Sequence, residues 1–313
     1  MLMGSNLSPF LDEKISAIHK ITIPTLSTLE EKLEAVAYMG SIPTQDSVNT
    51  LNEALNMVEI PLSGSSSTKA TDFRGGLLIY QAAYSLAINP NPIGIKILIE
   101  NIKDRESHPF LREACVYGLG KIHKYQAYDA LLLALNDPEE PVRTRSLMSI
   151  KNTLESNSQI PLRELNKIQE ALCIFYLKNN RKIDTKDTSE NFLARYLIVK
   201  YKNPIALMLL KNTLNHNNNI VQKLMALEIL IEMDSVNIEN ILLPLLISKN
   251  QHPDLYVAIG GVLGESNSVR AKNIASKIVN QNFLKLQILS FLLPTYGLGL
   301  LERYKASLKI LGF

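Results

Sequence analysis

Apolar residues recur at helical spacing along almost the whole chain, and polar or turn-forming residues interrupt them at short intervals. The interruptions carry Asn, Pro, Gly, Asp or Ser, residues that end one helix and begin the next. Five prolines stand where a helix would begin, a position at which the missing backbone N–H costs nothing; they are Pro92, Pro109, Pro161, Pro204 and Pro253. The pattern therefore predicts helical hairpins in series and leaves almost no room for strands.

The expected helices follow one another closely along the chain. A single helix over 9–19 comes first, and the pairs are 28–40 with 44–58, 72–87 with 92–102, 109–122 with 126–135, 139–154 with 161–177, 188–202 with 204–214, 220–233 with 238–247, 253–264 with 268–279, and 283–293 with 300–311. We expect N-terminal helices and an atypical first repeat over 1–62, a Ser/Gly-rich loop over 63–71, a repeat solenoid over 72–280, and apolar capping helices over 281–313.

The first helices of several pairs share a register of small residues. Cys115 and Gly118 stand four and seven places after Leu111, and Ser146 and Ser149 stand at the same offsets from Val142. Small residues at these offsets lie on one helix face and allow a neighbouring helix to approach closely. From Leu111 to Val142 is 31 residues, which is within the range of helical-repeat units.

The run from Asp137 to Arg143, Asp-Pro-Glu-Glu-Pro-Val-Arg, resembles a HEAT-like repeat of the type found in phycobilin lyases and many bacterial scaffold proteins. In that family an acidic residue in a turn is followed six places later by a basic one, and the two form a ladder between repeats. Asp137 with Arg143 and Glu106 with Arg112 match this spacing. The resemblance implies an all-α fold, an α-solenoid of about seven to eight HEAT-like hairpins.

Composition narrows the functional classes. Lys and Arg number 33 against 30 Asp and Glu, a formal charge of +3 that lacks the basic excess of a dedicated nucleic-acid binder. A stripe of cations could still track a phosphate backbone. Two of these cations, Arg112 and Arg143, are assigned to the ladder, and acidic residues nearby dilute the charge of the others. The stripe consists of Lys103, Arg105, Arg112, Lys121, Lys124, Arg143, Arg145 and Lys151.

Residue types that could act in catalysis or bind a metal are scattered along the chain. The five histidines stand singly, without a second ligand at metal-site spacing, so we expect no metal and no cofactor. Cys115 and Cys173 sit within apolar helical patterns and read as buried free thiols. No catalytic residues are assigned, and we expect that the chain is not an enzyme.

Aromatic side chains are the remaining candidates for a binding site. Tyr125 and Tyr128 open a second helix, and second helices line the concave face of HEAT-like stacks. With Lys124, Arg163 and Lys167 they could form a groove for a partner. The alternative is that Tyr128 closes the packing of its own hairpin.

These observations favour a non-enzymatic scaffold or adaptor that binds another protein along a helical-repeat surface, as part of a larger assembly. The first alternative is a HEAT-like enzyme or enzyme subunit, of bilin-lyase or base-excision type. The second is peripheral membrane association through the apolar stretch 283–301. We expect a cytoplasmic location, because the N-terminal residues lack the pattern of a secretory signal.

Overall fold

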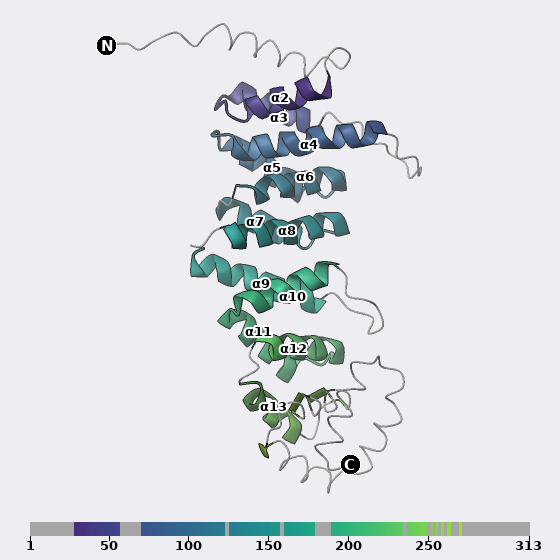
Figure 1. The fold of residues 1–313 in the computed structure, drawn as a ribbon, viewed down its shortest axis with the longest axis vertical. Coiled ribbons are helices and arrows are strands. Elements are labelled where there is room, and N and C mark those ends of the chain that lie inside the picture. Colours follow the sequence, from purple (N-terminus) through teal and green to yellow (C-terminus); the bar gives the residue numbers. More distant parts are fainter. Residues whose placement is uncertain are drawn as a thin grey trace, which may run out of the picture. The chain divides into compact units, whose positions relative to one another are not determined.

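A computed structural model describes residues 28–56, 70–122, 125–156, 160–178, 189–233 and 237–248, together with residues 252, 255, 258, 259, 262, 263, 269 and 270. Within these residues the structure has twelve α-helices and no strand (Figure 1). The expected fold class, an all-α solenoid of HEAT-like helical hairpins, is confirmed. Three expected helices lie wholly outside the described residues, at 9–19, 283–293 and 300–311. Of the helix expected at 268–279, only residues 269 and 270 are described.

The helix bounds agree with the hydrophobic pattern to within a few residues. The helices are α2 (Leu29–Met39), α3 (Gln45–Asn56), α4 (Ala70–Ile88), α5 (Ile93–Lys103), α6 (Pro109–Gly120), α7 (Tyr125–Ala134), α8 (Glu140–Ser156), α9 (Leu162–Lys178), α10 (Ser189–Tyr201), α11 (Pro204–His216), α12 (Ile220–Met233) and α13 (Ile238–Ile247). Pro109 and Pro204 occupy first turns, as expected. No helix of the described residues is long and apolar enough to cross a membrane, and 283–301 lies outside them.

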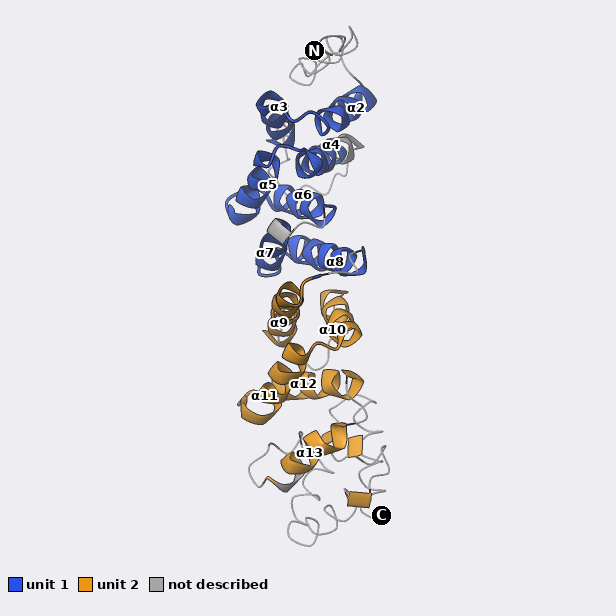
Figure 2. Ribbon diagram, turned by 90° about the vertical axis from the view of Figure 1, so that its left-hand side faces the viewer, with its two compact units in different colours: residues 1–160 blue, residues 161–313 orange. Residues whose placement is uncertain are grey.

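The chain divides into two compact units, Met1–Ile160 and Pro161–Phe313 (Figure 2). The boundary falls between the helices that the sequence pattern pairs as 139–154 and 161–177.

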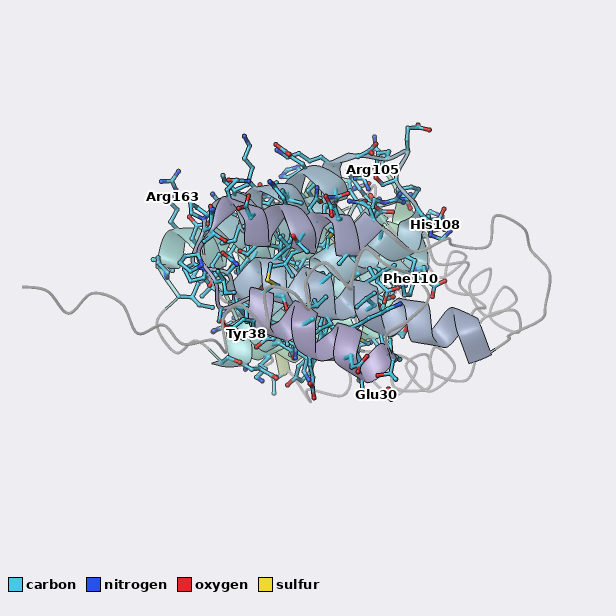
Figure 3. The ribbon with its side chains drawn as sticks, turned by 90° about the horizontal axis from the view of Figure 1, so that it is seen from above. Glu30, Tyr38, Arg105, His108, Phe110 and Arg163 are labelled. Carbon is cyan, nitrogen blue, oxygen red and sulfur yellow. The ribbon has the colours of Figure 1, made fainter. Side chains whose placement is uncertain are left out.

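Unit 1 consists of two rows of helices. The first helices of its pairs, α2, α4, α6 and α8, pack successively against one another, and α3, α5 and α7 form the second row (Figure 2). Each second helix also packs against the first helix of the next pair. Glu30 and Phe110, which lie in the first turns of α2 and α6, occupy the same end of the unit, and Tyr38 lies toward the other end (Figure 3). The first helices therefore run in the same direction.

Glycines allow the close packing within unit 1. A Cβ added at Gly118 would lie 2.5 Å from the backbone oxygen of Ala83, on the preceding first helix. A Cβ at Gly94 would lie 2.3 Å from the oxygen of Leu86. Such distances are too short for any side chain, so the small-residue register has the close-packing role that its spacing predicts.

Buried polar residues join successive pairs of unit 1. Asn89 is 1% exposed and donates through Nδ2 to the carbonyl oxygens of Met39 and Ile42, at 3.0 and 2.9 Å. Arg112 donates to both carboxylate oxygens of Asp137, from Nε at 2.9 Å and from Nη2 at 3.0 Å. These bonds satisfy polar groups that would otherwise be costly to bury.

Side-chain amides of Asn and Gln join helices in unit 2, whereas the Arg112–Asp137 ion pair does so in unit 1. Its helix α9 packs on α10 and α11, and α12 packs on α10 and α11. Asn203 donates to Asn166 at 2.9 Å and caps α11 by accepting from the backbone N–H of Ile205. Gln222 accepts from Asn217 at 2.6 Å and donates to the carbonyl oxygen of Leu177.

Candidate functional site

The residues proposed for a partner groove are divided between the two units. Lys124 and the side chain of Tyr125 lie outside the described residues. Tyr128 is 2% exposed, so its ring packs inside unit 1, which is the alternative that the sequence left open. Arg163 is exposed (Figure 3), and Lys167 pairs with Glu164 at 3.3 Å, both in unit 2. A groove formed by all five residues stays a prediction.

The four residues proposed for the ladder have different partners. Arg112 forms an ion pair with Asp137, which is 25 residues further along the chain. Arg143 donates to the backbone oxygens of Asp137 and Pro138. The side chain of Glu106 is exposed, and its backbone N–H donates to Asp104.

Four of the eight cations of the basic stripe pair with acidic residues. Arg105 and Arg112 both pair with Asp137, and Lys151 pairs with Glu155 at 3.6 Å. Arg145 pairs with Glu113 at 2.9 Å. These cations therefore do not form an open track for a phosphate backbone.

Arg145 instead belongs to an aromatic and charged cluster that covers the outer face of the first-helix row in unit 1. We call this cluster the Tyr80 surface; its residues are Tyr80 from α4, Phe110, Glu113 and Tyr117 from α6, Lys121 just after α6, and Arg145 from α8. Helical spacing puts the α6 residues on one face, because they stand at i, i+3 and i+7.

Three aromatic rings form the centre of the Tyr80 surface. Tyr80 contacts Phe110 and Tyr117 edge to face, with ring centroids 5.5 and 5.1 Å apart. The tip of the Phe110 ring lies against Gly76, where a Cβ would be 3.0 Å away. All three rings are half-buried, so each keeps part of its surface exposed to solvent.

Two cations lie over these rings. The guanidinium carbon of Arg145 is 5.5 Å from the Tyr80 ring centroid and 5.6 Å from that of Tyr117. The Nζ atom of Lys121 is 5.2 Å from the Tyr117 centroid. These distances are within the range of cation–π attraction.

Glu113 holds the cluster in place. Its Oε1 atom accepts from the Tyr80 hydroxyl at 2.7 Å and from Arg145 Nε and Nη2 at 3.1 and 2.9 Å. Burial, together with the hydrogen bond to Glu113 and its negative charge, raises the pKa of Tyr80 above its usual value. The phenol is therefore protonated at neutral pH and stays a hydrogen-bond donor to Glu113.

Sequence reasoning assigned Arg145 to the basic stripe and Glu113 to the acids that dilute it, and it did not select Tyr80 or Tyr117. A signal was present in the spacing. Tyr80 and Glu113 are 33 residues apart, and Glu113 and Arg145 are 32 apart, which is one repeat each. Residues one repeat apart occupy equivalent places on successive first helices.

Neither described cysteine is set up for nucleophilic chemistry. Burial raises the pKa of the Cys115 thiol far above its usual value. Burial, and then the charge of Glu170, raises the pKa of Cys173 to about 12. Both thiols are protonated at neutral pH. Among the described residues there is no group of three or more His, Cys, Asp or Glu side chains placed to hold a metal ion.

Comparisons with known proteins find similar folds. No protein-family model and no curated protein sequence matches this chain. One similar structure is the complex of CpcE and CpcF of phycocyanin lyase from Nostoc sp. PCC7120, at 17% identity and a TM-score of 0.37, covering 87% of this chain and 95% of that chain. Another is human deoxyhypusine hydroxylase in complex with glycerol, at 13% identity and a TM-score of 0.35, covering 97% of each chain.

The paired helices of the described residues match the helical-repeat fold that the sequence resemblance implies. The expectations of a non-enzymatic scaffold and of a chain that is not an enzyme are contradicted. The finding against them is that both similar structures are named as enzymes, a lyase and a hydroxylase. Sequence reasoning ranked the alternatives wrongly because a repeat fold without a recognisable motif does not reveal its chemistry.

Proposed function

We propose that this chain is a HEAT-like enzyme subunit that works in a complex with a second protein, and that the second protein docks on the Tyr80 surface. The observation that carries the proposal is the cluster of three half-buried rings with Arg145 lying over two of them. Tyrosine and arginine are among the residue types that contribute most to binding energy at protein interfaces.

Exposed apolar residues extend the Tyr80 surface on both sides. Leu77, one turn before Tyr80 on α4, is 41% exposed. Met148, one turn after Arg145 on α8, is 44% exposed. Methionine and aromatic residues are enriched in interface cores. Exposed aromatic, methionine and arginine side chains on successive first helices support partner contact.

The arrangement is also held in position before any partner binds. Glu113 bonds both Arg145 and Tyr80, so these two long side chains have already lost much of their rotamer freedom. A partner that docks here has less side-chain entropy to remove, which favours affinity.

The finer class that we propose is a lyase of the phycobilin type. The support is the sequence resemblance of residues 137–150, and free buried thiols at Cys115 and Cys173 support the expected reducing, cytoplasmic location. Incubation of the chain with a bilin, with and without the second protein, is expected to shift the bilin absorbance bands. An unchanged spectrum in both mixtures would refute the lyase class.

The docking site is tested with a photo-crosslinking amino acid placed at Met148 in the native cell. Met208 on α11 in unit 2 is the matched control, because it is a methionine of similar exposure, 49%. We expect one protein to be crosslinked from position 148 and not from 208, and to be lost when Arg145 is replaced by alanine. Equal capture from both positions would refute docking on this surface.

A further inference from the structure

The Tyr80 surface has hydrogen-bond donors that the described fold does not use. Arg145 donates to Glu113 and Tyr80 through Nε and Nη2, and Nη1 has no acceptor among the described residues. Lys121 is exposed and contacts the Tyr117 ring, but no described carboxylate lies within ion-pair distance of it. The surface therefore offers two cationic donor groups toward solvent.

Charge on the Tyr80 surface is uneven as a result. Glu113 neutralises the charge of Arg145. Lys121, at the C-terminal end of α6, has no described carboxylate to neutralise its charge. The acidic residues Glu30 and Glu31 lie in the first turn of α2. Glu30 is at the end of unit 1 where the first helices begin, opposite to the end where α6 finishes (Figure 3). A segment lying along the first helices would thus meet aromatic rings in the middle and a positive charge at one end.

We propose that the segment docking on the Tyr80 surface is a peptide strand or helix of the second protein with an apolar or aromatic anchor followed by a carboxylate, which pairs with Lys121. This inference rests on the proposed function and adds the chemistry of the partner. The anchor packs on the exposed part of the Tyr117 ring, and the carboxylate accepts from Lys121 and from Arg145 Nη1. Charge-assisted bonds of this kind are stronger than neutral ones and select the partner as well as hold it.

Selection of random twelve-residue peptides displayed on phage tests this chemistry directly on the full chain. On the native protein we expect enriched peptides to carry Asp or Glu close to an aromatic or aliphatic residue. The charge reversal Lys121→Glu is expected to replace the acidic residues by Lys or Arg in the selected peptides. It is also expected to weaken binding of the original peptides by about tenfold or more in fluorescence anisotropy.

Lys103→Glu is the matched control for charge reversal. Lys103 is exposed and ends α5, so its replacement changes net charge and the interaction with the helix dipole in the same way as Lys121→Glu. The control is expected to change peptide affinity by less than about twofold. Circular dichroism of both variants confirms that they are folded.

The outcomes separate this inference from the proposed function. Met148→Asp should abolish peptide binding, whereas Met208→Asp should not. If neither variant loses peptide binding, docking on this surface is overturned. If Met148→Asp loses peptide binding but the peptides selected on the native protein are neutral or basic, the acidic partner is overturned and docking on this surface is retained. Displacement of the selected peptides by a single-stranded oligonucleotide at physiological salt would assign the surface to nucleic acid instead, and would also overturn the inference.

Discussion

Replacing Asp137 by alanine should destabilise unit 1 by about 3–5 kcal/mol, because it leaves a buried arginine without its partner. The side chains of Asp137 and Arg112 are 0% and 2% exposed. Asp137 accepts two hydrogen bonds from Arg112, one from the backbone of Glu139, and a further bond from Arg105. Since a domain is stable by about 5–15 kcal/mol, this loss is a large fraction of the total.

Urea unfolding of the full chain, followed by circular dichroism, measures the loss. Hydrogen exchange of α6, α7 and α8 then locates it, because unfolding of a repeat protein is not a single two-state event. Asp104→Ala is the control: Asp104 is an exposed carboxylate in the preceding turn, bonded to Ser107 and to the backbone of Glu106. We expect the control to leave the unfolding midpoint nearly unchanged.

A double variant separates the ion pair from the fold around it. Asp137→Ala combined with Arg112→Met removes both charges and leaves an apolar side chain in the arginine site. Replacing a buried ion pair by apolar residues is often neutral, so the double variant should be more stable than Asp137→Ala alone. If Asp137→Ala costs no more than the Asp104 control, or if the double variant is no better than the single one, the reasoning is refuted.

The ion pair also predicts a dependence on pH. Burial raises the pKa of Asp137, but hydrogen bonds from Arg112 and from the Glu139 backbone, with the charges of Arg112 and Arg105, outweigh it and lower the pKa below its usual value. A carboxyl with a lowered pKa in the folded state contributes stability above its unfolded pKa of about 3.9. That contribution is lost as pH falls through the folded value, so native unit 1 should weaken below about pH 4 more than the double variant does.

Three further predictions concern local packing and reactivity. Gly118→Ala should cost about 1–3 kcal/mol in urea unfolding, because the added Cβ would lie 2.5 Å from the backbone oxygen of Ala83; an unchanged midpoint would contradict it. Cys115 and Cys173 should resist a thiol reagent at pH 8 in the folded chain and react in denaturant, because burial raises both pKa values; rapid labelling of either in the folded chain would be inconsistent with its burial. Thr28→Ala should weaken α2 by about 0.5–2 kcal/mol in hydrogen exchange, because the Thr28 hydroxyl caps the helix; unchanged exchange in the first turn of α2 would show that the cap does not stabilise it.

The fold was predictable because each helix of a repeat is specified locally. The prolines in the first turns of α6 and α11 and the apolar residues at helical spacing set the helix bounds without reference to distant parts of the chain. The small residues at Cys115 and Gly118 further predicted close contact between first helices, and the structure places Gly118 against Ala83.

The polar contacts between repeats were less accessible to the sequence. The spacing of six places pointed to Arg143 as the partner of Asp137, whereas the Asp137 carboxylate binds Arg112 of α6 and Arg105 of the turn before α6. Arg143 donates to the backbone oxygens of Asp137 and Pro138. Which arginine reaches a carboxylate depends on the offset between successive helices, and a spacing along the chain does not contain that offset.

Burial decides what such clusters do, and the two units illustrate the point with the same residue types. In unit 2 the Tyr176 hydroxyl and Arg195 both bond Glu228, as Tyr80 and Arg145 bond Glu113 in unit 1. The unit 2 network joins α9, α10 and α12, and its tyrosine, Tyr176, is 0% exposed. Tyr80 is half-buried among other exposed rings, so the same chemistry there forms a surface. The residue types of the two networks are the same, and only the packing of the neighbouring helices separates a buried tyrosine from one that keeps part of its ring exposed to solvent.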